Sequence, residues 1–297
     1  MKNNSVSRRK ALKNIAGGAT SLLAAPFLQG QDQLVVTDPS NTWKGTINHS
    51  VCYWCFNFIP FETFVQQIKQ MGLQGIDLVS PKDWPILQKY GLTCTMAEGA
   101  EIGLTKGWND PQYHSKLIDN YLKHIDLTAK AGYKNLICFS GNRNGMDDEQ
   151  GLENCVKGLQ KIMAAAEKKG ITIQMELFNS KVDHPDYMCD RSAWGIELCK
   201  RLGSENFKLL YDIYHMQISE GDIIRTIREN HQYFGHYHTA GVPGRHEIDE
   251  SQELYYPAIM QAIAETGYQG YVAQEFLPTD KTSLQALEKA VGICDVR

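Results

Sequence analysis

From Thr46 onward the sequence alternates short extended runs with helix-like segments, and it does so eight times without a linker or a domain break. Alternation of this kind is typical of α/β folds with a parallel sheet. Eight such units in roughly 250 residues favour a closed (β/α)8 barrel over an open doubly wound sheet. No Gly-x-Gly-x-x-Gly opens a helix after the first run, which weighs against a dinucleotide-binding fold. The sequence therefore predicts an α/β protein with a single (β/α)8 TIM barrel.

The strands expected from this pattern are TINHSVCYWCF, GIDLVS, LTCTMAEG, NLICFSG, ITIQMELFN, FKLLYD, QYFGHYH and GYVAQEF. The first helix-like segment places apolar residues at 61, 64, 65, 68 and 71, which lie on one face of a helix. Glycines that end helices follow several of these segments. The expected helices span residues 61–71, 83–90, 110–131, 148–169, 188–202, 219–230, 255–265 and 283–293.

Side chains that bind metals stand where four successive predicted strands end. Glu176 ends ITIQME, Asp212 ends FKLLYD, His238 ends FGHYH and Glu275 ends YVAQE. The carboxyl ends of the strands of a barrel open into one shared mouth. One such acid alone is more often a salt-bridge or capping residue than a metal ligand, but four equivalent positions on successive strands indicate a common site. Three carboxylates and one imidazole suit Mn²⁺ or Mg²⁺, with Co²⁺ or Zn²⁺ as alternatives.

The chain resembles the hydroxypyruvate isomerase branch of the xylose-isomerase-like TIM barrels, to which the tagatose and psicose 3-epimerases are related. The resemblance covers about residues 46–290, and its most specific parts are DIYHMQ, GHYHTAGVPGRHE, MELFN, QEF and the segment 253–255. It implies that Glu176 and Glu275 bind the metal and exchange the substrate proton. It also implies that Asp212 is a ligand, and that His238 occupies a ligand position that is His in the epimerases and Gln in typical hydroxypyruvate isomerases.

The same resemblance implies that His215 and Arg245 contact substrate oxygens. Arg245 could hold a carboxylate with two hydrogen bonds or a sugar hydroxyl, and the sequence leaves both alternatives open. His238 favours a sugar substrate, whereas PGRHE favours hydroxypyruvate. The expected activity is isomerisation of hydroxypyruvate to tartronate semialdehyde through an enediolate. The alternatives are a ketose 3-epimerase or other sugar isomerase, a metal-dependent lyase or hydrolase, and a periplasmic sugar-binding protein without catalysis.

Further candidates surround this predicted site. His49, near the end of the first extended run, and Trp54 are expected to contact substrate, with a structural role as the alternative for each. Phe56 and Trp108 fit a pocket wall or the core equally well. The remaining candidates are Asp183 and His184, which could close over substrate, and His236, which could orient a ligand. The Cys52-x-x-Cys55 motif lies on a strand and its exit, so small buried side chains are expected there rather than a redox pair.

The amino terminus differs from the rest of the chain. Arg8 and Arg9 precede a mildly apolar run, 15–28, which together resemble a twin-arginine export signal, although Ala11 replaces the usual Phe. We expect residues 1–33 to be this signal, residues 34–297 to be the barrel, and the protein to be periplasmic. A basic tail without a signal is the alternative.

A net charge of −4 gives no electrostatic footprint for nucleic acid, so no nucleic-acid partner is expected. A membrane span is not expected either. The expected partner is a small hydroxy-carbonyl compound or sugar. A homo-oligomer is compatible with the sequence, which does not fix the oligomeric state.

Overall fold

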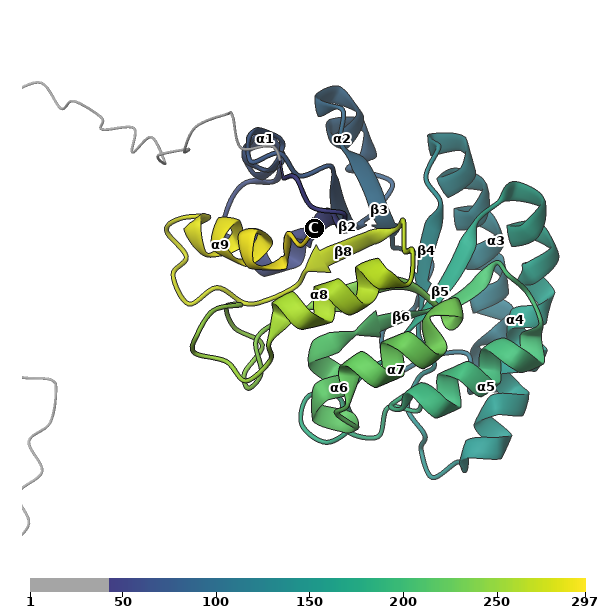
Figure 1. Cartoon of the computed structure of the whole chain (residues 1–297). Helices are drawn as coiled ribbons and strands as arrows, with labels where there is room; N and C mark the ends of the chain where they lie inside the picture. The colour runs from purple at the N-terminus through teal and green to yellow at the C-terminus, as the bar shows by residue number, and fades with distance from the viewer. Residues whose placement is uncertain (1–42) are drawn as a thin grey trace, which may run out of the picture. The chain divides into compact units, whose positions relative to one another are not determined.

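A computed structural model describes residues 43–297, which form a closed barrel of eight parallel strands (Figure 1). Neighbouring strands follow one another in chain order, and β1 also pairs with β8 to close the barrel. The strands are β1 (Asn48–Cys52), β2 (Gly75–Val79), β3 (Thr93–Ala97), β4 (Asn135–Cys138), β5 (Thr172–Glu176), β6 (Phe207–Asp212), β7 (Phe234–Thr239) and β8 (Tyr271–Gln274). The predicted barrel is confirmed. The predicted export signal lies outside the described residues.

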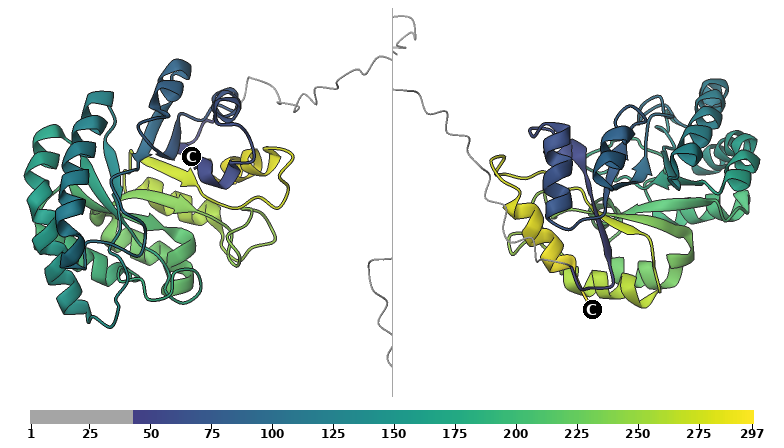
Figure 2. Two further views of the ribbon diagram at one scale, coloured as in Figure 1. Left: turned by 180° about the vertical axis from the view of Figure 1, so that it is seen from behind. Right: turned by 90° about the horizontal axis from the view of Figure 1, so that it is seen from above.

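The helices lie on the outside of the strands (Figure 2). They are α1 (Phe61–Gln70), α2 (Trp84–Tyr90), α3 (His114–Ala131), α4 (Asp148–Lys169), α5 (Ser192–Leu202), α6 (Ile213–Ser219), α7 (Ile223–Asn230), α8 (Tyr256–Glu265) and α9 (Gln285–Cys294). The apolar face expected for α1 is buried through Phe64, Val65 and Ile68. Helices α3 and α4 end where Gly132 and Gly170 take left-handed backbone conformations that cost glycine little.

The segment after β6 differs from the prediction of one helix over 219–230. Helix α6 starts directly after the strand, because the side chain of Asp212 accepts a hydrogen bond from the backbone N–H of His215. Gly221 then takes a left-handed conformation between α6 and α7. The two carboxyl oxygens of Asp212 therefore have different roles, since Oδ1 caps α6 while Oδ2 lies toward the barrel mouth.

The barrel interior is polar below its mouth. Ser50, Asp77, Thr95, Gln174 and His236 are all buried. Gln174 donates to Asn135 at 2.9 Å, and a side chain in place of Gly235 would come within 2.7 Å of the Gln174 oxygen. Successive side chains of a strand point to opposite faces, so Gln174 and Glu176 of β5 share the inner face of the barrel while Ile173 and Met175 point toward the helices.

All eight cysteines of the chain lie among the described residues, where they are buried and form no disulfide. Burial raises the pKa of the Cys52 and Cys55 thiols well above the usual value, so the structural interpretation of that motif agrees with their surroundings. Within residues 43–297, no helix is long and apolar enough to cross a membrane.

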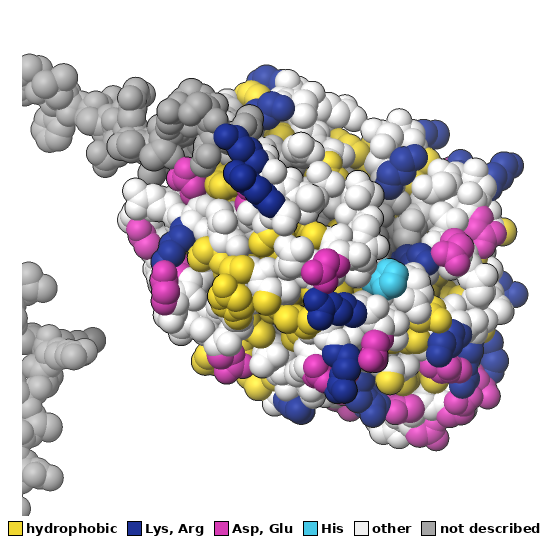
Figure 3. Space-filling model, viewed as in Figure 1, with side chains coloured by type: hydrophobic (Ala, Val, Ile, Leu, Met, Phe, Trp, Pro, Cys, Tyr) yellow, Lys and Arg dark blue, Asp and Glu magenta, His cyan; other side chains and the backbone are white. Residues whose placement is uncertain are grey.

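One face of the barrel carries a group of apolar side chains around α8, with charged side chains at its border (Figure 3). A hollow at the start of α8 is lined by both apolar and polar residues, and Tyr255 is largely exposed. Its lining residues are Asp249, Glu250, Gln252, Glu253, Leu254, Tyr255, Tyr256, Pro257 and Ile293. The homo-oligomer stays a prediction.

Candidate metal centre and active site

The four predicted ligands converge at the carboxyl ends of β5 to β8. Glu176 and Asp212 are the last residues of their strands, His238 pairs in register with Asp212, and Glu275 directly follows β8. One ligand atom from each lies within 4.8 Å of the others, and all four residues are buried. Four strands that are neighbours in the barrel therefore bring together residues that are far apart in sequence.

The spacing of these atoms fits a single divalent cation. His238 Nδ1 lies 2.7 Å from Glu275 Oε2 and 3.1 Å from Glu176 Oε1. Ligands that share an ion at bond lengths of about 2.0–2.2 Å stand roughly 3–4 Å apart, so small adjustments suffice. Three carboxylates and an imidazole favour a hard or borderline ion, as the sequence predicts.

The electrostatics of the cluster also favour a cation. Burial raises the pKa of Glu176, and it raises that of Asp212 to about 7 although Arg245 opposes this. Burial would do the same to Glu275, but the charges of Arg245 and His238 hold its pKa below the usual range. Burial would lower the pKa of His238, yet the charge of Glu275 raises it well above the usual value. A metal-bound imidazole is neutral, so a cation would displace the proton from Nδ1.

Arg245 lies beside the ligands and is almost buried, with 12% of its side chain exposed. Its Nη2 donates to Asp212 Oδ2 at 3.2 Å and also to Glu275 Oε2. The guanidinium lies over the ring of Trp54, 5.4 Å from its centre, and over that of Tyr214 at 5.3 Å. A planar cation held in this way can present N–H groups to a carboxylate or a hydroxyl at the barrel mouth.

Trp54 and His215 also belong to this cluster. Trp54 lies on the short 3-10 helix η1 (Tyr53–Phe56), where its Nε1 donates to Glu275 Oε1 at 2.8 Å. His215 lies on α6, with Nε2 3.6 Å from Asp212 Oδ2. Burial, and next the charge of Arg245, lower the pKa of His215 well below its usual value. The structure thus brings seven of the eight predicted site residues together.

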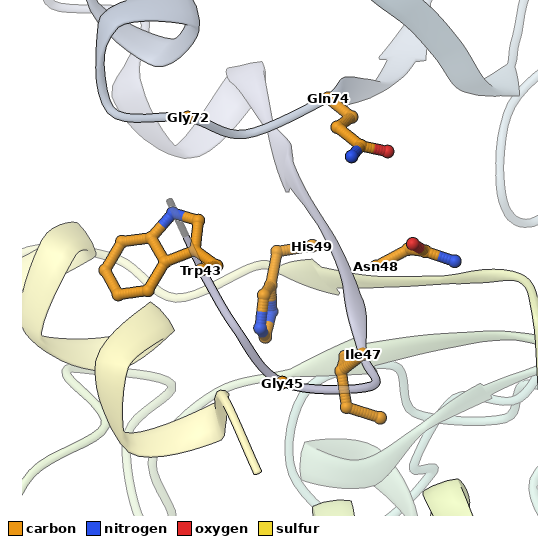
Figure 4. Close-up of a pocket in the computed structure, with 7 residues that line it drawn as sticks. All are labelled: Trp43, Gly45, Ile47, Asn48, His49, Gly72 and Gln74. Atoms are coloured by element: carbon orange, nitrogen blue, oxygen red, sulfur yellow. The ribbon is translucent and has the colours of Figure 1, made fainter. Parts of the chain in front are cut away.

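His49 is the exception, and its expected position is wrong. Strand β1 is shorter than the extended run in the sequence, so His49 lies near its amino end rather than near the mouth. Ser50 and Cys52 point into the barrel, and the alternation of a strand turns His49 outward. There it lies beside Trp43, on the other side of the strand from Asn48 (Figure 4). Its Nε2 lies 3.5 Å from Asp295 Oδ1. This is the structural alternative considered for it.

A buried network lies beneath the ligands, and of its members only His236 was predicted from the sequence to orient a ligand. Asp77 in β2 accepts from His236 Nε2 at 2.5 Å, His238 Nε2 at 3.2 Å and Ser50 Oγ at 2.7 Å, and Thr95 also donates to it. Because Nε2 of His238 is held by Asp77, its Nδ1 faces Glu176 and Glu275. Carboxylates commonly orient metal-binding histidines in this way. The available signal was a single charge inside the apolar run GIDLV.

A cavity of about 380 Å³ opens above the ligands. Glu176, Glu275, Trp54 and Arg245 form one side, and the rest of its lining comes from Leu78, Glu98, Glu101, Gly103, Leu104, Ile137, Phe139, Phe178 and His184. Glu98 was not anticipated, although it directly follows β3 just as Glu275 directly follows β8, so the acid at the end of LTCTMAEG was the available signal. Burial, and next the charge of Glu101, raise the pKa of Glu98 to about 7.

The structure separates the other candidates. His184 lines the cavity and stacks on Phe178 with ring centres 4.1 Å apart. Phe56 and Trp108 are fully buried in the core and do not line the cavity, which corresponds to the packing alternative. Asp183 does not line it either, but accepts a hydrogen bond from Tyr214 at 2.9 Å.

The fold and the four side chains at the strand ends together define a TIM barrel with a candidate metal centre at its mouth. The chain belongs to the xylose isomerase-like TIM barrel family, whose model matches residues 85–290.

Relatives with assigned names are of two kinds. A protein of Cupriavidus necator named 2-oxo-tetronate isomerase is 38% identical over 40% of this chain and 45% of its own length. A protein of the same name from Pectobacterium atrosepticum is 32% identical over 76% of this chain and 90% of its length. A human putative hydroxypyruvate isomerase is 33% identical over 36% of this chain and 39% of its length. The match therefore spans less than half of the first and third relatives.

Solved structures agree on the fold. A Brucella melitensis protein described as an AP endonuclease of family 2 superposes with a TM-score of 0.73 at 24% identity, covering 83% of this chain and 96% of that one. A D-psicose 3-epimerase superposes with a TM-score of 0.65 at 17% identity, covering 84% and 94%. At these identities the likeness concerns the fold alone.

Proposed function

We propose that this protein is a divalent-metal isomerase of small hydroxy-keto acids, acting through an enediolate. The observation that carries the proposal is the convergence of two buried glutamates, Glu176 and Glu275, with Asp212 and His238 within 4.8 Å. The relatives support the isomerase class, and their names point to acids of three or four carbons. Hydroxypyruvate and its conversion to tartronate semialdehyde head the candidate reactions.

The chemistry requires removal of a proton beside a carbonyl group. A divalent ion, with Mn²⁺ or Mg²⁺ favoured by the ligands, would stabilise the negative charge that develops on the substrate oxygens. Glu275 is kept ionised by Arg245 and His238, so an unprotonated carboxylate is present to accept the proton. Glu176, whose pKa is raised by burial, is suited to hold and return one. Transfer between neighbouring carbons gives isomerisation, and return to the opposite face of the same carbon gives epimerisation.

Other side chains would bind and orient the substrate. Arg245 faces the cavity and brings a positive charge to its wall, which supports an acid over a neutral sugar. Trp54 holds Glu275 by its indole N–H, which limits the positions of that carboxylate. Phe139 and Phe178 make the wall apolar, which strengthens the electrostatic interactions at the ligands by excluding water.

A ketose 3-epimerase is the second candidate. Two observations favour it, namely histidine at position 238 and the size of the cavity. Hydroxypyruvate has seven non-hydrogen atoms and displaces at most about 210 Å³ at about 30 Å³ per water-sized unit. The cavity therefore has room for a longer substrate.

Hydrogen exchange with solvent tests both candidates. The metal-loaded protein is incubated in D₂O with hydroxypyruvate, a 2-oxo-tetronate and a panel of ketoses, and deuterium at the carbon beside the carbonyl is followed by NMR. We expect exchange and product with at least one hydroxy-keto acid. Exchange with ketoses alone would favour the epimerase. Bound but unchanged compounds throughout would refute both and leave a binding protein.

We also propose that the protein acts in the periplasm. Arg8, Arg9 and the apolar run 15–28 support a twin-arginine signal, a pathway that exports folded proteins.

A further inference from the structure

The mouth of the barrel has two halves that face each other. Strands β5 to β8 supply the four candidate ligands, whereas β2, β3 and β4 supply a far wall of the cavity through Leu78, Glu98 and Ile137. Strands β3 and β7 are four places apart in the closed order of eight. Glu98, directly after β3, therefore stands across the mouth from the end of β7.

The far wall is apolar around Glu98, and Leu78 shows that the backbone is distorted to make it so. Asp77 points into the barrel, so the alternation of a strand would turn Leu78 outward, yet Leu78 lines the cavity. Leu78 is the extra residue where β2 changes register against β3, and its backbone is left-handed, with φ of 56°. Leucine rarely takes this conformation, and bulges that re-aim a side chain are common beside active sites.

Glu98 brings a carboxyl group into this wall without a partner in the protein. Within residues 43–297 it has no hydrogen bond and no ion pair. Its neighbour Glu101 accepts from the backbone N–H of Gly99 at 2.9 Å, and Lys82 lies 3.9 Å from Asp83 instead. Because burial raises the pKa of Glu98 to about 7, its carboxyl group can donate as well as accept near neutral pH.

A substrate that covers this acid must supply a hydrogen-bond partner, because a polar group that loses its water without one is destabilised. Hydroxypyruvate has no group left for the contact. Its carboxylate would face the positive charge of Arg245, and its other two carbons are the pair between which the proton moves. It also fills at most about 210 Å³ of a cavity of about 380 Å³. A longer substrate would extend toward β3.

We propose that Glu98 is a specificity-determining residue that forms a hydrogen bond with a hydroxyl group beyond the reacting carbons. The preferred substrate is then a hydroxy-keto acid of four or five carbons with a terminal hydroxyl, rather than hydroxypyruvate. The reaction rests on the proposed function, whereas recognition of the hydroxyl can be measured without it. A substrate analogue without that hydroxyl would leave Glu98 unpaired, which is how sites built for a hydroxyl reject such analogues.

Binding of acids that cannot react tests the contact alone. Sugar acids of four and five carbons without a keto group are titrated calorimetrically into Mg²⁺-loaded protein, each with and without its terminal hydroxyl. We expect at least one hydroxylated acid to bind about 10–10²-fold more tightly than its deoxy analogue, as for one hydrogen bond to an ionisable group. Equal affinities within both pairs, or no binding of any of these acids, would overturn the proposal.

Two substitutions assign the preference to Glu98. Glu98→Leu keeps the wall filled but removes the carboxyl group, whereas Glu98→Gln keeps a group that donates and accepts. We expect the preference for the hydroxylated acid to disappear in Glu98→Leu and to be largely retained in Glu98→Gln. Glu229→Leu, on the exposed surface of α7, is the control and should keep the parental preference. A Glu98→Leu variant that melts like the parent and retains the preference would overturn the proposal.

The same contact should appear in turnover. The ratio of kcat/KM for the four-carbon hydroxy-keto acid to kcat/KM for hydroxypyruvate should fall by about 10–10²-fold in Glu98→Leu. An unchanged ratio in that variant would contradict the proposal. A preference in binding without isomerisation of any hydroxy-keto acid would refute the proposed function alone. Isomerisation with equal affinities within both pairs would refute the role of Glu98 alone.

Discussion

Replacing Asp77 by Asn tests how the buried network supports the metal centre. The carboxylate is fully buried and receives hydrogen bonds from Ser50, Thr95, His236 and His238. The variant preserves its shape but places an NH₂ group or a weaker acceptor against the two imidazoles. One partner of a buried charged pair is thereby lost, which typically costs about 3–5 kcal/mol of unfolding free energy. For a domain of this size that corresponds to a fall in Tm of about 6–20 °C.

The metal affinity should fall as well. His238 Nε2 loses the acceptor that turns Nδ1 toward Glu176 and Glu275, and such changes behind a ligand usually cost about 10–100-fold in affinity. Isothermal titration with Mn²⁺ gives the affinity, and a thermal scan of the metal-free protein gives the stability. Asp119→Asn, on the exposed surface of α3, is the control. Wild-type Mn²⁺ affinity in Asp77→Asn would refute the role assigned to this network.

Three further predictions follow from the site and the amino terminus. Glu275→Gln should lower kcat by about 10²–10⁴ because a general base is lost, while Glu229→Gln, on the exposed surface, should leave kcat unchanged. Steady-state kinetics measure kcat for both variants, and parental activity in Glu275→Gln would contradict the mechanism. The pKa of Glu98 is raised from 4.5 to about 7 by burial and Glu101, so the folded state holds the proton more tightly than the unfolded state and stability is lost as pH rises through that window. Urea unfolding at pH 5 and pH 8 should therefore show a smaller loss in Glu98→Gln than in the parent, and equal losses would disprove the assignment. Changing Arg8 and Arg9 to Lys should leave the protein in the cytoplasm, as cell fractionation would detect; unchanged export would remove the twin-arginine assignment.

The regular parts of the fold could be predicted because they depend on local pattern. Each strand is a short apolar run, and each long helix has an apolar face and is followed by a glycine. Eight repeats of such a unit are compatible with few folds. The four ligands could be predicted for the same reason. A residue that ends a parallel strand in a barrel has a position that the architecture fixes, so Glu176, Asp212, His238 and Glu275 needed no knowledge of side-chain contacts.

What could not be predicted depends on details of register and of distant contacts. His49 was placed wrongly because strand β1 starts at Asn48 and gives way to η1 after Cys52, which shortens the extended run. Asp77 is in the middle of its strand, and its importance becomes visible only where β2 and β7 bring it under two histidines. Helix α6 was missed because its cap is Asp212, a residue already assigned to the site.

The central claim is that four strand-end side chains share one divalent cation. A crystal soaked in Mn²⁺ and measured at a wavelength where manganese scatters anomalously tests it most directly. We expect one strong anomalous peak about 2.0–2.3 Å from oxygens of Glu176, Asp212 and Glu275 and from Nδ1 of His238. A peak bound by other residues, or no peak at this position at saturating Mn²⁺, would contradict it.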